Sequence, residues 1–226
     1  MTGFQLQRAR TARQWTQAEL AARLDVSQGY VCLLERGARR VPTPLAETLV
    51  RVLDMSPSTL PVSANTDALD APGAVRALAA LGDDRFAERP RRRERRNPAE
   101  VVLRCLRAPD LDARVVEGLV RVLVAHADLD WAWLVRHVKV DDLQNRLGFL
   151  VSLAAAVAQR EGRAEVGAQL AAARAVLERS RLAAEGAFRT TLTEAERRWL
   201  RQHRPPEAAH WNLLTNLTAT VVRDAA

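Results

Sequence analysis

The segment from Gln17 to Arg36, with the sequence QAELAARLDVSQGYVCLLER, constrains the fold of this chain more than any other part. Its two short helical stretches each follow a good N-cap residue, Thr16 or Ser27, whose hydroxyl can accept a backbone N–H in the next turn. Ala21 supplies the small side chain that is needed where two crossing helices come closest. The pattern predicts two helices that cross through a tight turn, and a plain amphipathic hairpin is the alternative. The apolar residues at core spacing are Leu20, Leu24, Val26, Val31 and Leu34.

On these residues the segment resembles the helix-turn-helix of the lambdoid phage repressor and Cro (Xre-like) family, and the resemblance covers residues 4–60 only. Asp25 departs from the family, which usually has Gly at this left-handed turn position. Asp adopts that conformation more readily than most other residues. Polar caps, Gly37 and two prolines divide the region into helices predicted at 4–13, 17–24, 28–36, 44–53 and 57–60.

The resemblance implies that the helix beginning at Ser27 enters the major groove of DNA with its first residues facing the base edges. Gln28 matches the family's principal base reader, and its amide can both donate and accept, as the N6 and N7 edge of adenine requires. Gly29 and Leu33 stand where relatives often carry polar readers. Readout therefore leans on Gln28, on apolar contact with thymine methyl groups and on DNA shape. Tyr30 can reach either a phosphate or a base edge.

Contacts with the phosphate backbone are implied at three further positions. Gln17 matches a family residue that contacts phosphate, aided by the positive end of its helix. Arg39 and Arg40 match the family's basic loop, and a solvated charged turn is the alternative. Arg10 and Glu35 match a partly buried salt bridge that joins the first helix to the end of the recognition helix. The predicted DNA-contacting residues are Gln17, Ser27, Gln28, Gly29, Tyr30, Leu33, Arg39 and Arg40.

The rest of the chain predicts a linker and a second helical domain. Residues 62–98 collect turn-forming residues and arginines around one short helix at 74–81, so they are predicted to link a domain at 1–61 to one at 99–226. The Arg-rich run at 89–96 is either a solvated linker or an auxiliary arm that contacts phosphate. Helices are predicted at 99–107, 111–127, 129–139, 141–160, 163–185, 193–203 and 207–221.

The expected fold is therefore all-α, with an amino-terminal five-helix repressor-like domain and a carboxy-terminal helical bundle. The stretch 141–185 is rich in Ala and Leu and predicts an antiparallel helix pair in that bundle. Four tryptophans of this region lie beside Leu or Val, which favours core packing, and an exposed aromatic patch for a partner is the alternative. They are Trp131, Trp133, Trp199 and Trp211.

The composition adds little to a functional assignment. A formal charge of +7, from 34 basic and 27 acidic residues, suits a polyanionic partner. All basic residues except Lys139 are Arg, however, which also fits a GC-rich bacterial genome. The two cysteines lie outside any Cys-x-x-Cys spacing, and neither a signal peptide nor an 18-residue apolar run occurs, so we expect a cytoplasmic protein.

No catalytic motif or zinc-ligand spacing occurs in the sequence, so we expect no enzyme, no cofactor and no metal site. The pair His203 and His210 is a weak metal candidate. We expect a sequence-specific DNA-binding transcriptional regulator, specifically a repressor, that binds double-stranded DNA as a homodimer and has no membrane partner. Residues 99–226 would serve dimerisation or bind a protein partner or a small ligand. The alternative functions are an antitoxin-like protein that neutralises a partner and regulates its own gene, and an unrecognised enzyme at 99–226.

Overall fold

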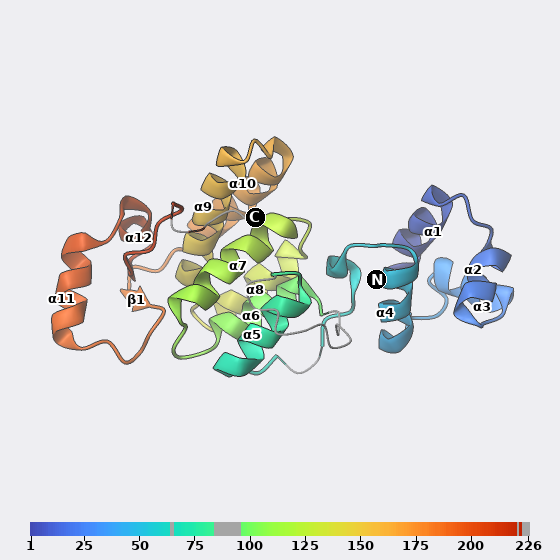
Figure 1. Ribbon diagram of the computed structural model, residues 1–226, viewed down its shortest axis with the longest axis horizontal. Helices are drawn as coiled ribbons and strands as arrows, with labels where there is room; N and C mark the ends of the chain where they lie inside the picture. Colours follow the sequence, from blue (N-terminus) through green and yellow to red (C-terminus); the bar gives the residue numbers. More distant parts are fainter. Residues whose placement is uncertain (64–65, 84–95, 221, 223–226) are drawn as a thin grey trace. The chain divides into compact units, whose positions relative to one another are not determined.

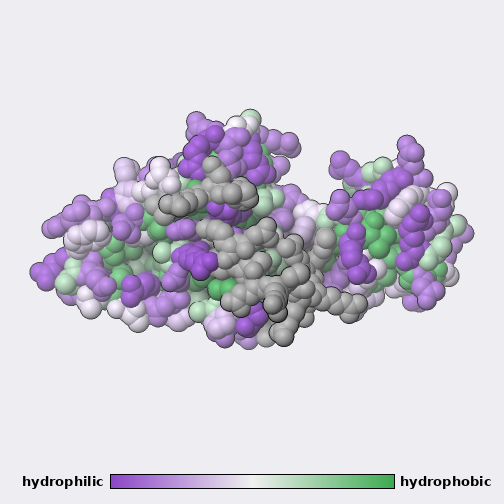
Figure 2. All heavy atoms as spheres, in the orientation of Figure 1, coloured by the Kyte–Doolittle hydropathy of each residue, from purple (hydrophilic) through white to green (hydrophobic). Residues whose placement is uncertain are grey.

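The computed structural model describes residues 1–63, 66–83, 96–220 and 222 (Figure 1). These residues form two compact units, the first from residues 1–63 with 96–97 and the second from residues 66–83 with the described residues that follow 97. On the face drawn in Figure 2, hydrophilic atoms cover most of the surface of the helices. Helices dominate both units, and the strands among the described residues are two residues long, so the predicted all-α fold is confirmed.

The first unit contains the five helical elements that the sequence predicts, each within two residues of its predicted bounds. The core between them is formed by Leu6, Leu20, Ala21, Val31, Leu34, Leu49 and Leu53, with Leu24 and Val26 packed against it partly buried. The elements are α1 (Gly3–Ala12), α2 (Gln17–Leu24), α3 (Gln28–Glu35), α4 (Thr43–Val52) and the short 3-10 helix η1 (Pro57–Thr59).

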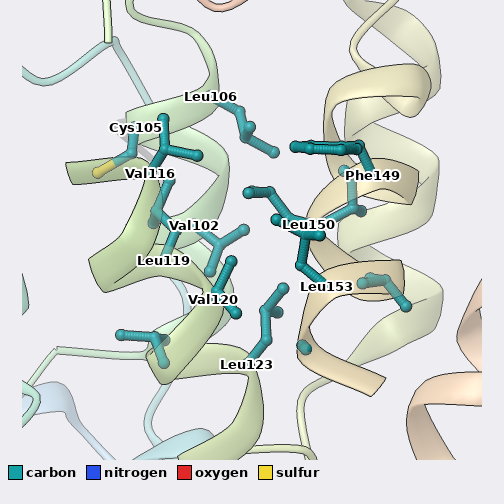
Figure 3. Close-up of a cluster of buried hydrophobic side chains, with 14 of the residues drawn as sticks. Val102, Cys105, Leu106, Val116, Leu119, Val120, Leu123, Phe149, Leu150 and Leu153 are labelled. Carbon is teal, nitrogen blue, oxygen red and sulfur yellow. The ribbon is translucent and has the colours of Figure 1, made fainter. Parts of the chain in front are cut away.

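The second unit is built around α9, whose residues are mostly buried. Figure 3 shows part of its core, where side chains of α6 and α7 meet Phe149, Leu150 and Leu153 of α9. Helix α10 turns back along α9, which confirms the predicted helix pair (Figure 1). The elements are α5 (Ala71–Ala80), α6 (Pro98–Leu106), α7 (Ala113–Ala125), α8 (Trp131–Val140), α9 (Gln144–Arg160), α10 (Ala164–Glu178), β1 (Gly186–Ala187), α11 (Glu194–His203), α12 (Pro206–His210) and β2 (Leu213–Leu214).

Two predicted helices are much shorter than expected. The helix predicted at 163–185 ends at Glu178 because Asn145 of α9 binds the backbone of Leu182, accepting its N–H at 2.9 Å and donating to its carbonyl at 3.0 Å. The helix predicted at 207–221 ends at His210. There Asn212 takes a left-handed φ of 50°, and the next two residues pair with β1 in parallel. Both ends depend on partners that are distant in the sequence.

Part of the predicted linker belongs to the second unit. Helix α5 begins three residues earlier than predicted, at Ala71, because Asp70 caps it by accepting the Gly73 N–H at 2.8 Å and because Pro72 suits the first turn of a helix. Its buried side chains, with Leu69, join the core. The Arg-rich run lies outside the described residues except for Arg96, and the predicted boundaries at 61 and 99 stay predictions.

The four tryptophans of the second unit differ in exposure. Trp211 is fully buried and its Nε1–H donates to the Ser152 hydroxyl at 2.9 Å, which confirms core packing at that position. Trp131 and Trp133 are half-buried against the core. Trp199 on α11 is 49% exposed, so the core prediction is wrong for this residue. The helix that carries it has no buried residue, because α11 packs on the rim of the unit rather than on α9.

Within the described part of the chain, the helices fall short of the length and apolar character that crossing a membrane requires. In the same residues, His, Cys, Asp and Glu side chains form no group of three that could hold a metal ion. The two histidines of the weak metal candidate, His203 and His210, make separate contacts. His203 Nδ1 lies 2.8 Å from the Trp199 carbonyl oxygen, and His210 Nε2 lies 2.8 Å from the Glu178 carboxylate.

Candidate nucleic-acid interface

Helices α2 and α3 cross through the tight turn that their sequence predicts. Thr16 and Ser27 cap the two helices by accepting the backbone N–H of Glu19 and Tyr30, at 3.1 Å and 3.2 Å. Asp25 ends α2 in the left-handed conformation, with φ 54° and ψ 47°. The turn position that is usually glycine in the resembled family is therefore left-handed here as well.

The first turn of α3 faces solvent while its opposite side is buried. Gln28 and Gly29 are exposed, and Leu33 extends the exposed side by one further turn. Val31 and Leu34 fill the core on the other side. A Cβ built on Gly29 meets nothing within 4 Å, so no packing requirement within the unit explains the glycine.

Tyr30 and the loop after α3 lie beside this exposed face. Tyr30 is half-buried against the core, and the Arg39 guanidinium lies 6.0 Å from the centre of its ring. The loop is held by a hydrogen bond from the Arg39 N–H to the Leu33 carbonyl at 3.3 Å, after Gly37 has taken a left-handed φ of 71°. Arg39 and Arg40 are both exposed, so two cations stand next to the end of α3.

The implied salt bridge between Arg10 and Glu35 is confirmed. Arg10 donates to the carboxylate through Nε at 2.6 Å and Nη2 at 3.0 Å, and the Glu35 side chain is only 3% exposed. Burial by itself raises the pKa of Glu35. The hydrogen bonds from Arg10 and Gln17 and the Arg10 charge outweigh it, so the pKa of Glu35 is lowered below its ordinary range. The bridge ties α1 to the end of α3.

Gln17 takes part in this bridge rather than pointing to solvent. Its Nε2 donates to Glu35 Oε2 at 2.8 Å, and the residue is half-buried. The resemblance implied that Gln17 contacts backbone phosphate, but its side-chain amide is held inside the unit. What remains at the start of α2 is the backbone N–H of Gln17, at the positive end of the helix.

The close approach between α1 and α3 at Gly3 has no signal in the sequence. A Cβ on Gly3 would collide with the backbone carbonyl oxygens of Leu34 and Glu35, which cannot move as a flexible side chain can. Glycine therefore allows the start of α1 to pack against the end of the recognition helix. Together with the Arg10 bridge, this contact fixes the direction of α3.

Replacing Gly3 with Ala is expected to destabilise the first unit by about 1–3 kcal/mol, because the backbone must shift to admit one methyl group. The measurement is hydrogen exchange of the α1–α4 amides in the full-length chain. Gly29→Ala is the matched control, since the space there is open and Ala favours a helix over Gly by about 0.5–1 kcal/mol. Equal exchange in the two variants would mean that α1 does not pack closely on α3.

One of the comparisons with known proteins agrees with this geometry. Residues 3–61 match the family model described as a helix-turn-helix domain. No curated protein and no solved structure matches the chain. The chain therefore carries a helix-turn-helix DNA-binding segment at residues 3–61.

Proposed function

We propose that this chain is a sequence-specific transcriptional regulator of the repressor and Cro (Xre-like) type, acting in the bacterial cytoplasm. The observation that carries the proposal is the exposed first turn of α3, which begins at Gln28. The opposite side of α3 is buried in the core, and the Arg10–Glu35 salt bridge holds the end of the helix. Such a helix can enter the major groove of double-stranded DNA without any rearrangement of the core.

Sequence readout is assigned to the exposed side of α3. Gln28 would pair with the N6 and N7 edge of an adenine, and Leu33 would contact thymine methyl groups. Gly29, with open space above it, would let the DNA approach the helix closely. Ser27 and Tyr30 flank this surface, with the Ser27 hydroxyl already accepting a hydrogen bond as the cap of α3.

Positioning on the duplex is assigned to the groups around α3. Arg39 and Arg40 would contact phosphates on one side of the groove, which requires no change in their exposed positions. Gln17 would contact phosphate through its backbone N–H, because its side chain is committed to Glu35. These contacts orient the protein but carry no sequence information.

A homodimer on a palindromic site is the assembly that suits this interface. A single domain of this size buries only roughly 600–1,000 Å² of its surface on DNA, so a second copy is the direct way to gain affinity. The second unit, with its own core, is the part available for dimerisation or for a partner or ligand. Occupying a promoter in this way would repress transcription.

Gln28→Ala is expected to reduce discrimination among DNA sequences by about 1–3 kcal/mol, while non-specific binding and folding stay nearly unchanged. The preferred site is first selected from a random duplex library with the full-length protein. Affinities for that site and for a scrambled site are then measured at one fixed salt concentration.

The matched control is Gln169→Ala, an exposed glutamine on α10 outside the matched helix-turn-helix. The control is expected to keep the full specificity ratio. An unchanged ratio in Gln28→Ala would overturn the assignment of Gln28 as base reader, and failure of the wild type to select any site would overturn the proposed function.

A further inference from the structure

A pocket of about 300 Å³ opens at the rim of the second unit. Its walls come from four separate stretches: the start of α7, the loop after β1, one side of α11 and the segment that follows β2. Most of the lining is apolar, and Figure 2 shows hydrophobic atoms reaching the surface between the segments labelled α7 and α11 in Figure 1. A volume of this size lies at the lower end of the range for small-molecule sites.

Trp199 gives this pocket an aromatic wall. It is 49% exposed, and its ring stacks on that of His203 with 4.4 Å between the ring centroids. The adjacent Leu200 and the buried Phe188 also line the pocket. A large aromatic side chain left half-exposed beside apolar neighbours is a surface against which a flat apolar molecule gains both area and ring contact.

Hydrogen bonds hold the walls of the pocket in place. The Leu111 N–H donates to the Phe188 carbonyl at 2.8 Å, and the Asp110 carboxylate accepts the Thr190 N–H at 2.7 Å. Helix α11 is fastened to the strand region by Arg201, which binds Glu185 at 2.8 Å and 3.0 Å. The pocket is therefore formed before any ligand arrives, so little ordering is needed on binding.

The polar groups of the pocket favour a ligand that accepts hydrogen bonds. Arg189 lines the pocket, and among the described residues no carboxylate lies within ion-pair distance of its guanidinium. Its charge does reach Glu196, whose pKa is lowered first by the hydrogen bonds from Thr193 and then by Arg189. Glu196 also lines the pocket, but its carboxylate is used at the start of α11, accepting the Thr193 N–H at 2.7 Å and the Thr193 hydroxyl at 2.8 Å. An arginine in this position offers several N–H donors to one anionic group.

We infer that this pocket binds a small aromatic carboxylate, with its ring against Trp199 and its carboxylate on Arg189. The ring of such a molecule matches the apolar wall that contains Trp199, and its carboxylate matches Arg189. Its size fits the pocket volume of about 300 Å³. The inference goes beyond the proposed function and does not depend on it. Binding is measured without DNA, so a failed binding experiment leaves DNA recognition untouched, and failure of DNA recognition leaves the pocket untouched.

The test is calorimetric titration of the full-length protein with naphthylacetate and with its neutral isostere naphthylacetamide. Naphthylacetate is expected to bind with one site per chain and a Kd of roughly 100 µM, given the usual affinity per ligand atom. Trp199→Ala is expected to weaken both compounds about tenfold. Arg189→Ser is expected to weaken naphthylacetate about fivefold and to leave naphthylacetamide within about twofold.

Two control variants remove the same residue types elsewhere in the unit. Trp133→Ala removes a tryptophan that also contacts a histidine four residues later, with 4.2 Å between ring centroids and the rings tilted by 32°, and that does not line the pocket. Arg174→Ser removes an exposed arginine of α10. Both are expected to bind like the wild type.

Three results would overturn the inference: no binding of naphthylacetate to the wild type, equal weakening by the controls, or equal loss of both compounds in Arg189→Ser. Sedimentation provides a further readout. If Trp199→Ala converted a dimer to a monomer and left naphthylacetate binding unchanged, the pocket would be a contact between two copies and the ligand site would be wrong.

Discussion

Replacing Arg10 with Met is expected to destabilise the first unit by about 3–5 kcal/mol at pH 7. The Glu35 carboxylate would lose both hydrogen bonds and the charge of Arg10, while remaining almost completely buried. Only Gln17 would still donate to it. Hydrogen exchange of the α1–α4 amides in the full-length protein measures this loss separately from the stability of the second unit.

The pH dependence of this variant distinguishes a stranded charge from lost packing. In the wild type the lowered pKa of Glu35 means that its contribution to stability is present above its ordinary pKa of 4.5 and is lost as the pH falls through the folded value. In Arg10→Met, burial dominates and the pKa of Glu35 rises, so protonation relieves the penalty. The difference between variant and wild type is expected to shrink as the pH falls from 7 to about 4.

Arg13→Met is the matched control for this experiment. Arg13 pairs with Asp54 at 3.8 Å, and their side chains are 39% and 82% exposed, so its loss is expected to cost at most about 1 kcal/mol. Adding Glu35→Gln to Arg10→Met is expected to recover part of the stability, because the buried charge is removed. Equal exchange in Arg10→Met and Arg13→Met would show that Glu35 is solvated.

Replacing Trp211 with Ala is expected to destabilise the second unit by about 3–5 kcal/mol. The ring is fully buried against Gly148 of α9, where a Cβ would collide with it, so its removal leaves a cavity in the middle of the core. The loss is measured by denaturant unfolding followed by circular dichroism and by exchange of the α9 amides.

Two further variants separate the sources of this loss. Ser152→Ala removes the acceptor of the Trp211 Nε1–H, together with the hydrogen bond that the Ser152 hydroxyl donates to the Gly148 carbonyl, and is expected to cost about 1–3 kcal/mol. Trp199→Ala removes the same residue type from a half-exposed position and is expected to cost less than either. If Trp211→Ala cost no more than Trp199→Ala, α9 would not be packed around Trp211.

The amino-terminal helices were predictable because the interactions that define them are local. The Thr16 and Ser27 hydroxyls accept hydrogen bonds from N–H groups three residues later. Asp25 adopts the left-handed turn conformation, which Asp tolerates better than most residues. The resemblance also identified the Arg10–Glu35 bridge, which spans 25 residues and does not follow from local pattern. The exposure of Gln28 agrees with its predicted role, but its contact with a base is still a prediction.

Other features depend on residues that only the folded chain brings together. The Gln17 amide turns inward because the Glu35 carboxylate, fixed by Arg10, lies within its reach. In the second unit, the end of α10 depends on Asn145, which captures the backbone of Leu182 from 37 residues away. No periodicity in the sequence marks such a partner.

The sequence by itself determined the helical class, the helix-turn-helix and the positions of most helix starts, because caps, turns and apolar spacing act within a few residues. The tertiary structure alone decided that Leu69 and α5 join the second core and that Trp199, unlike Trp211, is exposed. Both tryptophans have a leucine within two residues in the sequence, and burial depends on which segment packs across the core. Long-range packing therefore decides which tryptophan is buried, and the same packing brings Trp199 and Arg189 together around one pocket.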